Sequence, residues 1–234
     1  MEKYKEYFNE FAREDVQEIL DICGTADKLI NERFHANIGE PELVAVIFSK
    51  IYTTILNKLE SLEKEYADFK INICDRLEIG YSTKQDEDDE KQGNFMVFIR
   101  HLNKDKKNDG ASDPQANTVE RAVQWNTENI VNQPELLRTI SVEALETLKS
   151  IGINIGLSEL IFPIFVTVYE EIVNYITIKR RETNEFEYEI NFISCFFIGI
   201  REGLDDEDDV IYIRPNIEAK LQLKNDVAAS SKYE

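Results

Sequence analysis

Two acidic runs are the places where residue types and spacing gather the most chemistry-bearing side chains. They lie at residues 86–90 and 205–209, and carboxylates grouped on one loop can bind Ca²⁺. The usual calcium loop alternates its ligands, turns sharply at a glycine and ends on a distal glutamate, and neither run has that spacing. We therefore expect exposed hairpin tips without a metal ion. Electrostatic docking is the alternative role for their carboxylates, which belong to Asp86, Asp88, Asp89, Asp205, Asp206, Asp208 and Asp209.

Other catalytic or cofactor-binding patterns are missing from the sequence. His35 and His101 lie far apart, and Cys23, Cys74 and Cys195 are too scattered to form a zinc-binding set. The sequence contains no G-x-S-x-G, H-E-x-x-H, C-x-x-C, G-x-G-x-x-G or G-x-x-x-x-G-K motif. We therefore expect a protein that is not an enzyme, with no catalytic residue, cofactor or metal site.

The charge balance limits the possible partners. The 234 residues include 46 Asp plus Glu against 27 Lys plus Arg, which gives a net charge of −19 at pH 7. Such a charge repels phosphate, so we expect no sequence-specific binding of nucleic acid through a basic face. An apolar fraction of 42% is ordinary for a folded chain, and the length suits one large domain or two smaller ones.

The sequence also bears on the compartment. No apolar run follows the first residues, and the longest strongly apolar stretch, residues 160–169, is about half as long as a membrane span. Three scattered thiols fit a reducing compartment. We therefore expect no membrane contact and a cytoplasmic location, either in a host cytoplasm or in the virion if a phage encodes the chain.

The strongest signal is an internal duplication. Shifting the sequence by 117 residues aligns positions 37–73 with 154–190 without a gap, and 13 of these 37 positions are identical. After a small slip the two acidic runs also align, and each precedes a short apolar strand that ends in Ile-Arg, at Arg100 and Arg214. For these matched arginines we expect an ion pair with a carboxylate on the neighbouring strand.

The residue pattern of each copy predicts a helical segment, a long central helix and a β-hairpin. Apolar residues recur at three- or four-residue spacing over 43–62 and 160–176, which is typical of a helix with a buried face. Period-two alternation replaces this spacing over 69–81 and 186–200, which predicts one strand in each copy. The fold class is therefore α+β, a tandem duplication of one antiparallel module with its copies related by a pseudo-two-fold axis.

The duplication also gives the expected domain boundaries. Repeat one spans residues 1–102, and a linker rich in Lys, Asp, Asn and Gly follows over 103–117. Repeat two spans 118–225 and adds a further strand at 217–223, where apolar and polar residues alternate. Residues 226–234 are expected to form a mobile tail.

The strand segment of repeat two is apolar on both faces. Its even-numbered residues would face the core, which leaves Ile193, Cys195 and Phe197 on the opposite face. Contiguous exposed apolar strips are rare in soluble proteins. We therefore expect the other repeat or another chain to cover these three residues, which are the interface candidates.

Together these observations favour a non-enzymatic structural protein of an assembly. A duplicated chain with extra apolar surface in one half behaves as a covalent pseudo-dimer, a common unit of rings and closed assemblies. Helix-plus-sheet modules with long hairpins are similar in architecture to phage neck, tail-completion and head–tail connector ring proteins. That resemblance implies a virion component with protein partners in a homo- or hetero-oligomer. The alternative is an acidic binding or inhibitory module, anti-defence or regulatory, that acts on a basic partner as a mimic of DNA.

Overall fold

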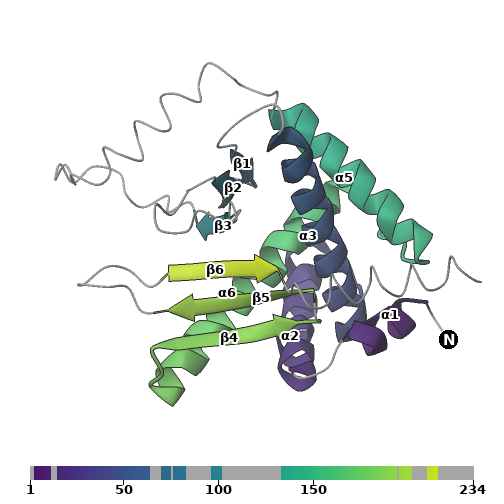
Figure 1. Cartoon of the computed structure of the whole chain (residues 1–234). Helices are drawn as coiled ribbons and strands as arrows, with labels where there is room; N and C mark the ends of the chain where they lie inside the picture. Colours follow the sequence, from purple (N-terminus) through teal and green to yellow (C-terminus); the bar gives the residue numbers. More distant parts are fainter. Residues whose placement is uncertain are drawn as a thin grey trace, which may run out of the picture.

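The fold alternates α-helices with the strands of two small antiparallel sheets, so its class is α+β as expected. The computed structural model describes residues 3–11, 15–63, 70–74, 76–82, 96–101, 133–193, 195–201 and 210–215. We call the elements from α1 to β3 the first half and those from α5 to β6 the second half. Figure 1 shows the helices behind and to the right of the sheet of the second half, with the sheet of the first half above it.

The helices follow the apolar spacing and the prolines of the sequence. Pro41 is the first residue of α3, and Pro163 lies in the first turn of α6, where its missing N–H removes no helical hydrogen bond. Both of these central helices have 23 residues. The helices are α1 (Lys3–Phe11), α2 (Val16–Phe34), α3 (Pro41–Glu63), α5 (Gln133–Ser150), the 3₁₀ helix η1 (Ser158–Leu160) and α6 (Ile161–Thr183).

Each half carries a three-stranded antiparallel sheet whose strands are neighbours in chain order. The sheet of the first half, sheet A, has its middle strand paired to both others, and sheet B of the second half repeats this arrangement. Sheet A contains β1 (Lys70–Ile73), β2 (Leu77–Ser82) and β3 (Met96–His101). Sheet B contains β4 (Glu187–Phe192), β5 (Phe196–Arg201) and β6 (Val210–Pro215).

The long strand expected in each repeat is a hairpin of two strands. Ile73 lies opposite Leu77 where sheet A turns, and Phe192 lies opposite Phe196 where sheet B turns. Three residues separate the partners of each closing pair, so residues of one parity stay on one face of the sheet through the turn. The alternation in the sequence therefore continues across the turn and conceals it.

Left-handed backbone conformations recur at matched positions of the two halves. One pair lies after the ends of α2 and α5, one before α3 and η1, and one in the first turn of each sheet. The first two pairs are 117 residues apart and the third is 119 apart, so the second half has two more residues between its second and third positions of this kind. The pairs, with their φ angles, are His35 (54°) and Gly152 (85°), Gly39 (96°) and Gly156 (86°), and Cys74 (53°) and Ile193 (42°).

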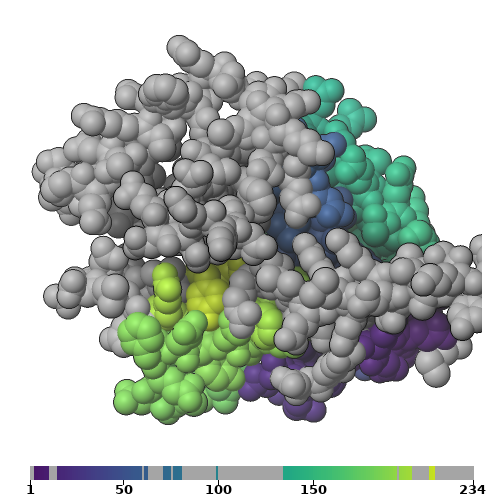
Figure 2. Space-filling model, viewed as in Figure 1, coloured from purple at the N-terminus to yellow at the C-terminus, as the bar shows by residue number. Residues whose placement is uncertain are grey.

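The halves interleave. Helix α2 packs against α6 of the other half, α5 packs against α3, and the two central helices also contact each other. In Figure 1, α5 flanks α3 along one side, while α2 lies next to α6 behind sheet B. Strands β3 and β6 lie side by side where the sheets meet. Figure 2 shows the same contacts between the halves at the surface. Teal residues of α5 lie against blue ones of α3, and green residues of the second half lie against purple ones of α2.

An aromatic cluster fills the centre of this arrangement. The rings of Phe48 on α3 and Phe165 on α6 stack nearly parallel, with centroids 5.0 Å apart and an interplanar angle of 9°. Phe48 also meets Phe192 edge-on at 5.1 Å, and Tyr52 meets Phe196 at 4.4 Å. Because two of these rings come from α3 and the other three from α6 and sheet B, the core joins the halves.

Several sequence expectations lie outside the described residues. These are both acidic runs, the linker at 103–117, the strand at 217–223 and the tail at 226–234. Within the described part, one helical stretch, Ser158–Thr183, is long and apolar enough to cross a membrane, and 56% of its apolar window is buried inside the protein.

The aromatic stack gives a stability prediction. Phe165→Ala should lower the free energy of unfolding by about 3–5 kcal/mol, since it removes a fully buried ring and leaves a cavity. Val142→Ala, at a side chain that is 41% exposed on α5, should change it by less than about 0.5 kcal/mol. Urea unfolding followed by circular dichroism measures both. A loss below about 1 kcal/mol for Phe165→Ala would show that the stack is not central to the core.

Candidate functional site

An ionic cluster ties the central helix of the second half to the first half. Glu170 of α6 has a side chain only 14% exposed, and its carboxylate lies 2.6 Å from the Arg76 guanidinium and 3.7 Å from that of Arg33. Arg76 belongs to the turn between β1 and β2, while Arg33 is in the last turn of α2. One carboxylate thus fixes a helix and a sheet of the first half against α6.

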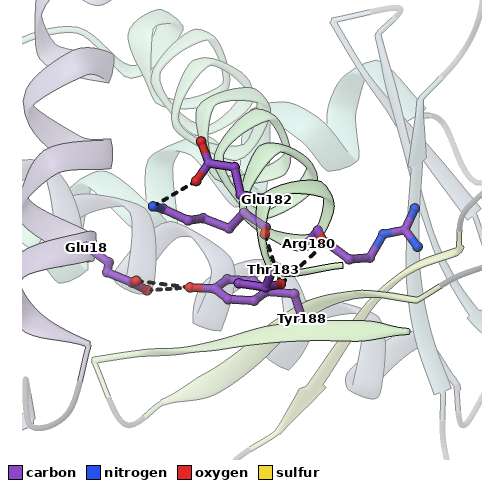
Figure 3. Close-up of polar contacts among 6 residues, drawn as sticks. Glu18, Arg180, Glu182, Thr183 and Tyr188 are labelled. Carbon is purple, nitrogen blue, oxygen red and sulfur yellow. Dashed lines mark hydrogen bonds and ion pairs between the residues drawn. The ribbon is translucent and has the colours of Figure 1, made fainter. Parts of the chain in front are cut away.

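Carboxylates at the start of α2 hold the edge of sheet B. Asp15 accepts a hydrogen bond of 2.7 Å from the backbone N–H of Asn191 in β4. Glu18 accepts from the hydroxyl of Tyr188, at 2.9 and 3.1 Å to its two oxygens. In Figure 3 the Tyr188 ring lies beside the end of α6 with its hydroxyl directed at Glu18. Since β4 is an edge strand, the Asp15 bond also occupies one of its outward N–H groups.

A tyrosine and two glutamates group on the outer face of sheet B. The hydroxyl of Tyr212 donates to Glu187 and to Glu189, at 3.0 Å to the latter. Burial and these carboxylates raise the pKa of Tyr212 above its usual value. A Cβ at Gly199 would lie 2.3 Å from the Tyr212 ring, so only glycine fits beneath that ring. The tyrosine is therefore fixed over the middle strand.

A polar cluster lies beneath α1, where the N-terminal helix meets the turn of sheet B. The Tyr7 hydroxyl is 3.5 Å from the Cys195 sulfur, and the Lys50 ammonium is 3.9 Å from the centroid of the Tyr7 ring. Burial lowers the pKa of Lys50, against an opposing contribution from Cys195. Burial raises the pKa of Tyr7, and Cys195 adds to that shift. Ser49 next to them is fully buried, and its hydrogen bond with Tyr7 partly offsets the rise in the pKa of that tyrosine.

The three interface candidates occupy different environments. Ile193 is fully buried in the core, because it forms the turn between β4 and β5 and does not continue the strand alternation. Cys195 is half-buried below α1 of the first half. Phe197 is half-buried on the outer face of β5, opposite Asn191 and Arg214. Their role as an interface stays a prediction, and the seven acidic-loop candidates lie outside the described residues.

The described residues contain no group of three or more His, Cys, Asp or Glu side chains that could hold a metal ion. No family model, curated protein or solved structure matches this chain at a significant level. What the described part offers is a set of contacts that hold two halves together, plus one polar cluster on the outer face of sheet B and another beneath α1. The interpretation of its function therefore depends on these contacts alone.

The ionic cluster gives a second prediction. Glu170→Gln removes the charge shared by Arg76 and Arg33 and should cost about 1–3 kcal/mol of unfolding free energy, since hydrogen bonds to charged groups are worth that much. Glu171→Gln is the matched control, because this neighbouring carboxylate accepts a hydrogen bond from Asn174 at an exposed site. Thermal melts compare the two variants. Equal melting temperatures for both would show that the cluster contributes no stability.

The raised pKa of Tyr175 predicts that the folded protein loses stability in alkali. Burial, together with Glu18, raises the pKa of Tyr175 to about 12, while an unfolded tyrosine has a pKa of about 10. The protonated form is therefore favoured by folding, so this contribution is complete below about pH 10 and is lost as the pH rises towards about 12. Unfolding free energies measured from pH 9 to 12 should fall less steeply in Tyr175→Phe than in the wild type. Superimposable pH curves would contradict this.

Proposed function

We propose that this chain is a non-enzymatic structural protein that acts through protein–protein contacts in an oligomeric assembly. The supporting observation is a difference between corresponding positions on the middle strands of the two sheets. In sheet A the strand register places Arg100 opposite the buried Glu78, whereas in sheet B it places Arg214 opposite the half-buried Phe197. An aromatic ring thus replaces a carboxylate at the corresponding place, which suits a face covered by a neighbouring protein.

The two halves are proposed to descend from a tandem duplication and to be related by a pseudo-two-fold axis. Helices α2 and α5 begin 117 residues apart, at Val16 and Gln133, and two of the three pairs of left-handed positions recur at the same spacing. Phe48 and Phe165, which are also 117 residues apart, stack on each other. Contact between equivalent residues is what a two-fold axis produces, so the stack is where this axis would pass.

A virion ring, such as a neck, head–tail connector or tail-completion component, is the specific form of assembly that we propose. A covalent pseudo-dimer supplies two similar but unequal faces, and unequal faces suit a ring position with different neighbours on each side. The location would then be the virion or the host cytoplasm. Protein partners are the expected ligands, with no cofactor, nucleic-acid or membrane role in this proposal.

The alternative function is an acidic module that binds or inhibits a basic partner. The net charge of −19 favours it, as do Glu187 and Glu189, which bring two carboxylates together around Tyr212 on the outer face of sheet B. Binding of this kind would weaken steeply with salt. A monomer whose binding to basic proteins disappears at high salt would favour this function over assembly.

Light scattering after size-exclusion chromatography tests the assembly proposal. The wild type should form a defined oligomer, and Phe197→Asp should shift it towards monomer, because burial of an unpaired carboxylate in an interface is costly. Ile178→Asp is the matched control, at an apolar side chain of α6 that is 55% exposed, and should leave the oligomer intact. A monomeric wild type, or the same oligomer in both variants, would contradict a contact through Phe197.

A further inference from the structure

The two arginines of the ionic cluster share a single carboxylate. Arg76 lies 2.6 Å from one oxygen of Glu170, and Arg33 lies 3.7 Å from the other. One carboxylate balances the charge of one guanidinium, so the cluster keeps one excess positive charge on a chain whose net charge is −19. Both arginine side chains are well exposed, at 42% and 48%. The excess charge is therefore accessible from solvent.

Contact with Glu170 leaves donors on both guanidiniums. An arginine carries five N–H groups in a planar fork, and this fork matches the two oxygens of a carboxylate. The distance of 3.7 Å between Arg33 and Glu170 is that of an ion pair and is too long for a hydrogen bond. Because the two arginines meet different oxygens of the same carboxylate, their charged ends are neighbours. A second acceptor group can therefore reach N–H donors of both.

The place that the pseudo-two-fold axis relates to this cluster has neutral residue types. The corresponding positions are Ser150 for Arg33, Thr53 for Glu170 and Cys195 for Arg76. The hydroxyls of Thr53 and Ser150 donate to carbonyls of their own helices. Helix α5 nevertheless packs against α3, as α2 packs against α6. The interleaved packing therefore does not require a charged cluster, and two exposed arginines exceed what it needs.

We propose that Arg33 and Arg76 form a binding site for a carboxylate group of a ligand. Glu170 holds the two guanidiniums next to each other, and the ligand carboxylate accepts hydrogen bonds from the N–H groups that Glu170 does not use. A single carboxylate balances the local excess of one charge, whereas the net charge of −19 opposes dianions and polyanions. The site is separate from the contact through Phe197 and does not depend on assembly.

Titration of the full chain with acetate tests this site. Acetate replaces chloride at constant ionic strength, while proton–nitrogen NMR follows the side-chain Nε–H signals of the arginines. The signals of Arg33 and Arg76 should shift in a saturable way with a shared midpoint. A parallel titration with inorganic phosphate should show weaker binding, because phosphate is largely a dianion above neutral pH. These wild-type measurements do not depend on the folding of any variant.

Three substitutions separate recognition by the guanidinium fork from general attraction. Arg33→Gln should weaken acetate binding, read at the Arg76 signal, about tenfold, since it removes one charge-assisted hydrogen bond. Arg33→Lys keeps the charge but loses the fork, and should weaken binding by a smaller factor. Arg138→Gln is the matched control, because it removes an exposed arginine of α5 outside the cluster, and it should leave binding unchanged.

Three results would overturn the proposal. Shifts that grow linearly with acetate and do not saturate would show general ionic effects without a site. Equal affinities in Arg33→Gln and Arg138→Gln would show that the fork of Arg33 does not bind the carboxylate. Tighter binding of phosphate than of acetate would show that the site is not selective for a single carboxylate.

Discussion

The stack of Phe48 on Phe165 is the contact on which the rest of the structure depends. Both rings are fully buried, one on each central helix. Parallel stacking at 5.0 Å requires the two helices to approach closely at this point. The position of sheet B depends on this contact, because its rings Phe192 and Phe196 pack against Phe48 and complete the same cluster.

The polar contacts around this core fix how the elements of one half are oriented against those of the other. Glu170 fixes α6 against the first half, and Asp15 with Glu18 fixes α2 against β4. All three carboxylates connect elements from different halves. Neither half therefore has a complete hydrophobic core or a complete set of polar partners by itself, and the two are expected to fold as one cooperative unit.

Much of the fold was predictable from the sequence because its periodicities are strong. The stripes over 43–62 and 160–176 predicted α3 and α6, and the period-two segments predicted β-structure. The turns at Cys74 and Ile193 were missed, since a three-residue loop preserves the alternation. The cluster beneath α1 had no sequence signal, because Tyr7 and Cys195 are 188 residues apart. Gly199 carried a sequence signal that was missed, since a glycine inside an apolar strand indicates a close approach of the kind that Tyr212 makes.

Native-state hydrogen exchange in increasing, sub-denaturing urea tests most directly whether the two halves form one unit. The most protected amides of α3 and of α6 should converge on the same free energy of opening with the same dependence on urea, because their shared core opens all at once. If the amides of one central helix exchanged through a smaller opening while the other stayed protected, the halves would be separate folding units. The central role of the Phe48–Phe165 stack would then be contradicted.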